Sequence, residues 1–262
     1  MTMPYTFGDS DEASRRLRRL AEVYESETRD LFDQVRSTCA DHPFELAIDL
    51  GCGPGWSTHL LAACLGPKLT VGLDASESYV AEARSNHPRL RFIQHDILAV
   101  PFPVGNADFL FCRFLLTHLP SARSALAAWA QAARPGAILA IHETEALHSA
   151  NPALIRYYQM VALMQRHYGQ ELNVGASLDQ AFAGTGWIPI HSESVNLKKS
   201  AREMSELHVA NLRTWRSDDF ARRTFDHDEV RDLERDLDAI ASGAQDVGFV
   251  YNTAKRLIAK RK

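Results

Sequence analysis

LAIDLGCGPGW, residues 46–56, is the stretch that decides the fold class of this chain. An apolar segment that runs into a glycine-rich turn is typical of a parallel strand whose following backbone approaches a bound nucleotide. The dinucleotide fingerprint needs a third glycine where this chain has Trp56, and no Gly-Lys-Ser/Thr follows as a P-loop would require. Asp49, two residues before the turn, would repel a pyrophosphate but attract an ammonium or a sulfonium. The turn is therefore predicted to hold a nucleoside that carries positive charge.

The segments around this turn alternate between short apolar runs and helical patterns. Helices are predicted near residues 56–65, 77–86 and 121–133, and Ser76 and Ser121 are the expected N-caps of the last two. Strands that alternate with helices indicate right-handed crossovers and a mostly parallel sheet covered on both faces. The runs predicted as strands are LAIDL, LTVGLD, LRFIQHD, ADFLFC and AILAIHE.

After residue 143 the pattern changes to longer helical stretches, which are predicted over 152–169 and near 177–184. WIPIHSESVNL and GFVYNTAKRLIAK are predicted as the sixth and seventh strands of the sheet. Between them, Ser200 with Glu203 and Asp226 with Glu229 predict the starts of two helices. We therefore expect an α/β, Rossmann-like, mostly parallel seven-stranded sheet with helices on both faces and a helical lid. Its predicted parts are an N-terminal helical cap over 1–40 and a domain over 41–262, with lid insertions near 145–180 and 200–243.

The composition favours a soluble cytoplasmic protein. The formal net charge is −4 and the pI about 6.3, so the chain lacks the basic balance of a nucleic-acid-binding protein. We predict that two basic clusters, RRLRR at 15–19 and KRLIAKRK at 255–262, are solvated faces. No apolar run is long enough to span a bilayer, and the N-terminus does not resemble a secretory signal. The four cysteines form no C-x-x-C pair, which fits a reducing compartment. Neither a membrane nor a nucleic acid is an expected partner, and oligomeric state is not predicted.

Two further acids follow the next two strands. Asp74 ends the second strand, where a carboxylate can accept hydrogen bonds from both ribose hydroxyls. Asp96 follows the third strand and could accept one from the exocyclic amine of an adenine. Ligands of open α/β sheets lie outside the carboxyl ends of the strands, and Asp49, Asp74 and Asp96 all map there.

The ordered series LAIDLGCGPG, VGLDAS, IQHDI, ADFLFCRFLLTHLP and RPGAILAIHE resembles the motifs of class I S-adenosylmethionine-dependent methyltransferases. The resemblance covers roughly residues 46–143 and implies S-adenosylmethionine as the cofactor. It implies that Asp49 and the glycine turn flank the methionine moiety, Asp74 holds the ribose, and Asp96 with the Ile97 backbone holds the adenine. Arg113 matches the position where family members contact the methionine end. The complete set of expected cofactor-binding residues is Asp49, Gly51, Cys52, Gly53, Gly55, Asp74, Ala75, Asp96, Ile97 and Arg113.

Catalytic residues are harder to predict, because methyl transfer depends mainly on proximity and orientation and needs a base only for an acceptor that must lose a proton. His118 follows the fourth strand, and Glu143 ends the fifth strand beside His142. Alternation along the strand allows one of these last two to face the cleft, and Glu143 is the one predicted. His118 and Glu143 are thus the predicted catalytic residues. The predicted acceptor-binding residues in the lid are Tyr157, Tyr158, His208 and Trp215.

The predicted function is metal-independent methyl transfer from S-adenosylmethionine to a small molecule, O- or N-methylation in preference to C-methylation. The segment after the fourth strand, CRFLLTHLP, lacks the Asp/Asn-Pro-Pro-aromatic motif of amine-directed DNA methyltransferases and the acid cluster of metal-dependent ones. A lid is consistent with enclosing a small acceptor. Two alternatives stay open: a tRNA or protein methyltransferase, supported only by the basic C-terminal strand, and a non-catalytic S-adenosylmethionine-binding protein.

Overall fold

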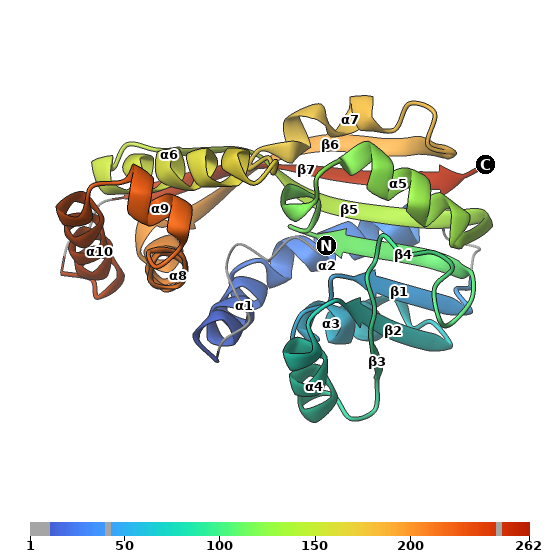
Figure 1. Cartoon of the computed structure of the whole chain (residues 1–262). Coiled ribbons are helices and arrows are strands. Elements are labelled where there is room, and N and C mark those ends of the chain that lie inside the picture. Colours follow the sequence, from blue (N-terminus) through green and yellow to red (C-terminus); the bar gives the residue numbers. More distant parts are fainter. Residues whose placement is uncertain (1–10, 40–42, 245–247) are drawn as a thin grey trace.

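The computed structural model describes residues 11–39, 43–244 and 248–262, and within them seven strands form one sheet. The strand order is β3-β2-β1-β4-β5-β7-β6 (Figure 1). The first five strands in this order, β3-β2-β1-β4-β5, are parallel to one another. Strand β7 lies between β5 and β6 and is antiparallel to both. The predicted Rossmann-like α/β class and its mostly parallel seven-stranded sheet are confirmed. The strands are β1 (Leu46–Leu50), β2 (Leu69–Asp74), β3 (Arg91–Gln94), β4 (Ala107–Arg113), β5 (Ala133–Ser149), β6 (Trp187–Ser200) and β7 (Phe249–Arg261).

Helices cover both faces of this sheet because alternate residues of each strand point to opposite sides. On one face, Phe109 and Phe111 of β4 pack with Phe32 of α2 and Leu61 of α3. On the other face, the intervening residues pack against α5 and α7, where Trp129 is fully buried. The helices of this part are α2 (Glu25–Thr38), α3 (Trp56–Leu65), α4 (Glu77–Asn86), α5 (Ala122–Gln131) and α7 (Leu178–Ala181), with short 3-10 turns η1 (Leu116–His118) and η2 (Val174–Ser177).

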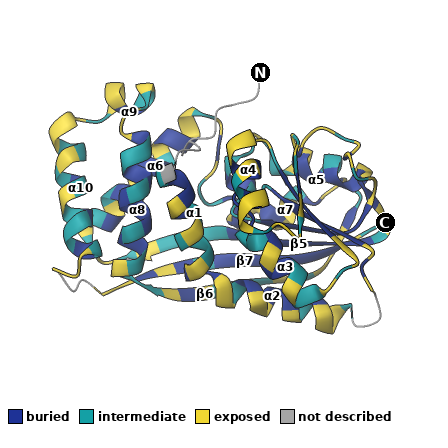
Figure 2. Cartoon of the chain, turned by 90° about the horizontal axis from the view of Figure 1, so that it is seen from below, coloured by how far each residue is buried: buried dark blue, intermediate teal, exposed yellow. Residues whose placement is uncertain are grey.

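The remaining helices gather beyond one end of the sheet and form the lid (Figure 1). Their apolar faces meet in a separate core that includes Trp215, Leu233 and Leu237. Figure 2 shows the pattern this produces, with exposed residues on the outer sides of the lid helices and buried ones toward the middle. The lid helices are α6 (Pro152–His167), α8 (Ala201–Trp215), α9 (Asp219–Thr224) and α10 (His227–Ala241), and α1 (Asp11–Val23) packs against α8.

Four helices begin at the capping residues that the sequence predicts. Ser76 and Ser121 accept hydrogen bonds from the first turns of α4 and α5, and Ser200 forms a complete capping box with Glu203. Asp226 caps α10 through backbone N–H groups of its first turn. The short helix α9 was not predicted, because its six residues are too few to show a helical period.

The boundaries of the cap and the lid differ from the prediction. Only α1 of the N-terminal region lies over the carboxyl ends of the strands, whereas α2 packs on the sheet through Leu31 and Phe32. Strand β5 continues to Ser149, and the segment with Val174 and Leu178 belongs to the core of the sheet and not to the lid. No helix in the described ranges is both long and apolar enough to cross a bilayer.

Candidate active site

A cavity of about 520 Å³ lies at the carboxyl ends of the parallel strands. Its walls come from the glycine turn after β1, the end of β2, the loop after β3 and the segment after β4, and α1 closes it through Leu17, Leu20 and Ala21. Most of the predicted cofactor-binding residues line it. Those that do are Gly51, Cys52, Gly53, Asp74, Ala75, Asp96, Ile97 and Arg113.

The glycine turn has a backbone that side chains would disrupt. Gly51 has a φ of +65°, and a Cβ added to it would lie 2.6 Å from Leu115 Cδ1. Gly55 has a φ of +90° and caps α3, where a Cβ would lie 2.9 Å from the Phe92 ring. Gly55 itself does not line the cavity. A glycine is therefore needed at position 55 because a side chain there would clash with Phe92. Gly51 and Gly53, in contrast, place backbone atoms without side chains in the cavity wall.

The carboxylate of Asp74 joins the ends of β1 and β2. One oxygen accepts the N–H of Gly53 at 2.8 Å and the other accepts the N–H of Ser76 at 2.9 Å. Each carboxylate oxygen has a second lone pair, so Asp74 can also accept from hydroxyl groups of a ligand. Asp96 is more exposed and uses one oxygen to accept the N–H of Leu98 at 2.9 Å. This end of the cavity thus presents hydrogen-bond acceptors.

Arg113 gives another part of the cavity wall a positive charge and hydrogen-bond donors. Its Nη1 donates to the Oγ1 of Thr28 at 2.8 Å. Burial lowers the pKa of Arg113, and the nearby Asp49 raises it, so the guanidinium stays charged. The cavity can therefore bind a ligand with hydroxyl or amine donors at one part and a carboxylate at another.

Asp49 is the cofactor-binding prediction that the geometry supports least. Its side chain does not line the cavity, and the residue is 1% exposed. Its Oδ2 accepts the hydroxyls of Ser57 and Thr58, each at 2.7 Å, in the first turn of α3. Burial raises the pKa of Asp49 to about 6, although the hydrogen bonds from those two hydroxyls and the charge of Arg113 act to lower it. Asp49 thus contacts the start of α3 behind the glycine turn and does not line the cavity.

Glu143 also has a different place from the one predicted. It is fully buried, does not line the cavity, and its Oε1 accepts the N–H groups of Leu115 and Leu116 at 2.7 Å each. Burial raises its pKa to about 8. The neighbouring His142 is buried as well, 5.0 Å from the Phe114 ring. Neither residue lines the cavity, because the turn after β4 covers this middle part of β5. The prediction of Glu143 as a base is not supported.

His118, the other predicted catalytic residue, does line the cavity. Burial, together with the positive charge of Arg16, lowers the pKa of His118 to about 3. A neutral imidazole with so low a pKa is a weak base at pH 7. His118 can therefore contact a ligand but is poorly suited to removing a proton from it.

A second chamber of about 120 Å³ adjoins the cavity and shares Leu20 and Phe114 with it. Three of the predicted acceptor-binding residues line this chamber: Tyr157, Tyr158 and His208. The Tyr157 ring stacks on His208 at 4.2 Å between centroids, and the Tyr158 hydroxyl lies 2.8 Å from His208 Nε2. Trp215 does not line the chamber. It is 1% exposed in the lid core, against Phe225.

Arg16 is the residue of this chamber that the sequence analysis missed. It belongs to the RRLRR cluster predicted as a solvated face, but it is 7% exposed and lines the chamber. The pKa values of His118 and His208 are both lowered to about 3. The larger cause is the burial of each histidine, and the positive charge of Arg16 is the second. Arg16 lines the chamber one helical turn before Leu20, which lines both compartments, so Arg16 lies near the junction of the two. The one available signal was the i, i+4 spacing of Arg16 and Leu20, which places both on the same helix face.

Comparisons with known proteins agree with this geometry. Residues 47–136 match a family model described as a methyltransferase domain. A trans-aconitate 2-methyltransferase of Methylobacterium nodulans is 38% identical over 109 residues, which cover 42% of each chain. A protein of the same name from an Azoarcus species is 28% identical over 173 residues, 54% of this chain and 68% of that protein. Residues 47–136 therefore form a methyltransferase domain of the class I S-adenosylmethionine-dependent type.

The similarity of fold to solved structures extends over the whole chain. Phosphoethanolamine N-methyltransferase 2 of Haemonchus contortus, solved with S-adenosyl-L-methionine, superimposes with a TM-score of 0.60 at 16% identity. That similarity covers 100% of this chain and 60% of the other, and at such low identity it shows the fold alone. By sequence, the chain spans under half the length of the first curated relatives it matches.

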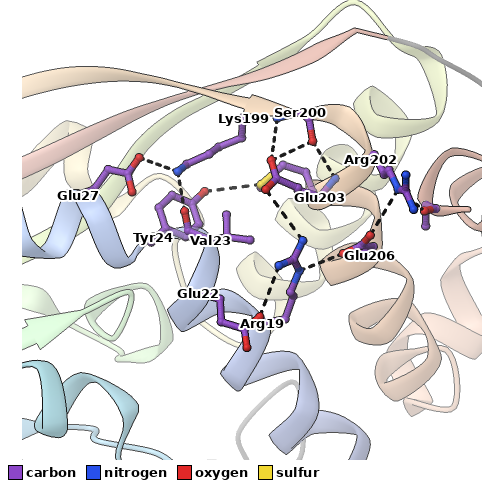
Figure 3. A network of polar contacts seen from close by, with 12 residues as sticks. Arg19, Glu22, Val23, Tyr24, Glu27, Lys199, Ser200, Arg202, Glu203 and Glu206 are labelled. Carbon is purple, nitrogen blue, oxygen red and sulfur yellow. Dashed lines mark hydrogen bonds and ion pairs between the residues drawn. The ribbon is translucent and has the colours of Figure 1, made fainter. Parts of the chain in front are cut away.

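Ion pairs hold α1, which forms the roof of the cavity, against α8 of the lid and connect β6 to α2 (Figure 3). Arg19 of α1 donates to Glu206 of α8 at 2.9 Å. Lys199, at the end of β6, donates to Glu27 of α2 at 2.6 Å and to the carbonyl oxygen of Val23 at 2.5 Å. Both side chains of the Lys199–Glu27 pair are nearly buried, at 11% and 13% exposure. This network fixes the angle between α1 and α2 and thus the position of the roof.

The basic C-terminal strand, which supported a macromolecular acceptor, is not a free basic surface. Lys255 and Arg256 lie within β7 and are 9% and 5% exposed. Lys255 donates to Asp179 at 2.9 Å, and Arg261 donates to backbone oxygens of α5 and of the turn before β6. The prediction that this cluster is a solvated face is therefore wrong for Lys255 and Arg256.

Among the described residues, no group of three or more His, Cys, Asp and Glu is placed to hold a metal ion. Metal independence stays a prediction.

Proposed function

We propose that this methyltransferase transfers the methyl group of S-adenosylmethionine to a carboxylate oxygen of a small-molecule acceptor. The observation that carries the proposal is the arrangement of the two compartments. A cavity with acceptors at Asp74 and Asp96 adjoins a smaller chamber, and Arg16 is buried near their junction. The first compartment suits the donor and the second suits the acceptor.

The residues of the large cavity fit the chemistry of S-adenosylmethionine. Asp74 would accept hydrogen bonds from the ribose hydroxyls, and Asp96 with the Ile97 backbone would hold the adenine. Arg113 would donate to the methionine carboxylate, while Gly51 and Gly53 allow the ligand to approach the backbone. When bound, this cofactor would supply an electrophilic methyl group; a carboxylate oxygen would bond to the methyl carbon as the carbon–sulfur bond breaks, giving a methyl ester with S-adenosylhomocysteine as the leaving group.

A carboxylate acceptor fits the protonation states of the nearby groups. The pKa of His118 is about 3 and Glu143 is turned toward backbone N–H groups, so neither is suited to deprotonating a hydroxyl. A carboxylic acid is already ionised at pH 7 and needs no base. Arg16 would hold such an acceptor by charge-assisted hydrogen bonds and orient one oxygen toward the donor cavity.

The relatives support the same class of acceptor, since they carry the name trans-aconitate 2-methyltransferase and trans-aconitate is a carboxylic acid. The similarity to the first of them is limited to less than half of each chain, so the acceptor of this protein needs its own experiment.

The donor is tested by thermal unfolding with S-adenosylhomocysteine and, separately, with NAD. Ligand at 100 times its Kd stabilises a folded protein by about 2.7 kcal/mol, so S-adenosylhomocysteine should raise the Tm and NAD should not. The acceptor is tested by S-adenosylhomocysteine release with a panel of small carboxylic acids and their amides. Turnover restricted to the acids supports the proposal, and turnover of the amides or of neither set contradicts it.

Arg16 offers a matched pair of variants for this test. Arg16→Met should lower kcat/KM for the acid by about 10- to 100-fold, because hydrogen bonds to a charged group contribute about 1.5–3 kcal/mol. Arg15→Met is the control, since Arg15 is exposed on the same helix. Equal activity of the two variants would count against a role for Arg16 in binding the acceptor.

A further inference from the structure

Phe114, which follows β4, has a backbone conformation that is unusual for a bulky residue. Its φ is +51°, and in the described ranges it is the one non-glycine residue with a positive φ. A residue with a Cβ is strained in this left-handed region, and it stays there only where the surrounding structure holds it. Because such residues gather at functional sites, the strain at Phe114 points to a function for its ring.

Two kinds of contact hold Phe114 in this conformation. Its N–H donates to the carbonyl oxygen of His142 at 2.9 Å, and the N–H groups of the next two residues donate to Glu143 Oε1 at 2.7 Å each. The ring packs edge-on against Tyr24, 4.9 Å between centroids, and lies 5.0 Å from the ring of His142. Strand β5 thus holds the backbone of Phe114, and two neighbouring rings hold its side chain.

Phe114 lines both the large cavity and the second chamber. Among the described residues, Leu20 is the only other one that lines both. Leu20 belongs to α1, the roof of the cavity, whereas Phe114 belongs to the turn after β4. Neither side chain can form a hydrogen bond. The boundary between the two compartments is therefore formed by two apolar side chains from two different elements.

The proposed reaction crosses this boundary. An oxygen presented from the chamber would have to come within about 3–3.5 Å of the methyl carbon in the large cavity, in line with the carbon–sulfur bond. A carboxylate is flat, and an unbranched carbon next to it can follow it between Leu20 and Phe114. A quaternary carbon is wider and would press against the Phe114 ring, which is held in place by its neighbours.

We propose that Phe114, together with Leu20, restricts the acceptor to acids that are unbranched at the carbon next to the carboxylate. This inference rests on the proposed function and deepens it by naming a substrate class. Phe114 is then a specificity-determining residue, and its strained backbone is the means by which an aromatic ring is placed at the boundary.

Pairs of acids test this preference, beginning with butyrate and 2,2-dimethylbutyrate, which differ by two methyl groups on the carbon next to the carboxylate. The wild type should esterify butyrate with a kcat/KM at least about tenfold higher, since one methylene group in a hydrophobic pocket changes kcat/KM by about 10- to 200-fold. Equal values, or a preference for the branched acid, would overturn the inference.

Phe114→Ala and Phe114→Gly test the residue itself. Both remove the ring, and glycine also adopts a positive φ without strain, so a second variant is at hand if the first does not fold. In each variant the ratio of kcat/KM for the branched acid to that for the unbranched acid should rise at least about tenfold. This ratio cancels the intrinsic reactivity of the two acids. A ratio equal to that of the wild type would overturn the inference.

Two further variants complete the test. Leu20→Ala widens the same boundary from α1 and should raise the ratio in the same direction; an unchanged ratio would overturn the part assigned to Leu20. Phe225→Ala is the matched control, because it removes a ring that packs against Trp215 in the lid and lines neither compartment. Its ratio should equal that of the wild type. A rise as large as in the Phe114 variants would mean general loosening and would overturn the inference.

Failure of this inference is distinguishable from failure of the proposed function. If the wild type methylates no carboxylic acid, the proposed function fails, and the inference fails with it. If the wild type methylates branched and unbranched acids alike, the inference alone fails. S-adenosylhomocysteine should still raise the Tm of the Phe114 variants. If it raises the Tm of the wild type but of neither variant, Phe114 serves donor binding and the inference is overturned.

Discussion

Replacing Glu143 by glutamine should change the pH dependence of stability and leave the donor cavity in place. The carboxylate Oε1 accepts the N–H groups of Leu115 and Leu116 at 2.7 Å each. Glutamine keeps an oxygen that can accept both bonds but does not titrate. The turn that positions Phe114 and His118 should therefore persist in Glu143→Gln.

The magnitude follows from the pKa of Glu143, which burial raises from its usual 4.5 to about 8. Between these values the folded protein holds a proton that the unfolded chain has released, so stability falls as pH rises. The contribution is complete below pH 4.5 and is lost as the pH passes about 8. One such proton is equivalent to about 1.4 kcal/mol per pH unit. Asp49, His118 and His208 also titrate near this pH range, but they are present in both the wild type and Glu143→Gln, so their contributions cancel in the difference between the two proteins.

The measurement is urea unfolding of the wild type and of Glu143→Gln at pH 6.5 and pH 8. The wild type should lose about 2 kcal/mol relative to the variant across this interval, which is 1.5 pH units. Activity gives the second readout, because loss of a general base would lower kcat by about 10²- to 10⁴-fold, whereas a retained backbone acceptor should leave kcat within about threefold. A constant difference in unfolding free energy between the two proteins, or a hundredfold fall in kcat, would refute the structural role.

Three further variants test the cavity and its roof. Asp74→Asn should weaken S-adenosylhomocysteine binding about tenfold in calorimetry, because charge-assisted hydrogen bonds become neutral; unchanged affinity would exclude the ribose role. Arg113→Met should weaken binding of S-adenosylhomocysteine by about 10-fold or more but that of 5′-methylthioadenosine, which lacks the carboxylate, by less than about threefold; equal losses would exclude contact with the methionine end. Lys199→Met leaves the nearly buried Glu27 without its cationic partner and should destabilise the protein by about 3 kcal/mol in urea unfolding; a loss of stability smaller than about 1 kcal/mol would contradict this.

The donor half of the site could be predicted because its signals are local. The glycine turn, Asp74 and Asp96 each follow a recognisable strand, and parallel strands bring their carboxyl ends to one edge. A short motif and a topological rule together place these residues at one cavity, and the cavity is found there.

The rest of the site depends on contacts between distant parts of the chain. Arg16 is buried only because α1 packs between the lid and the strand ends, and a run of arginines gives no sign of that burial. Glu143 was predicted to face the cleft because residues alternate along a strand. The backbone turn that covers it, residues 114–116, comes from the neighbouring strand β4 and has no signature in the segment around Glu143. Asp49 was predicted to flank the cofactor because of its charge and its place before the turn, but its Oδ2 accepts the hydroxyls of Ser57 and Thr58 in α3, and such a contact has no signature in the sequence.

The pairing of β6 with β7 has a consequence for protein engineering. Ser200 and Phe249 are register partners across these strands, and the Ala201 N–H donates to the Gly248 carbonyl at 3.0 Å. Helices α8 to α10 are thus, topologically, the loop of a β-hairpin. The entropy of closing a loop grows slowly with its length, by about 0.6 kcal/mol per doubling, so loops of very different size are compatible with the same hairpin. The segment that supplies His208 can therefore be exchanged as one cassette through two adjacent junctions, and acceptor preference can be redesigned without altering the motifs around Gly51.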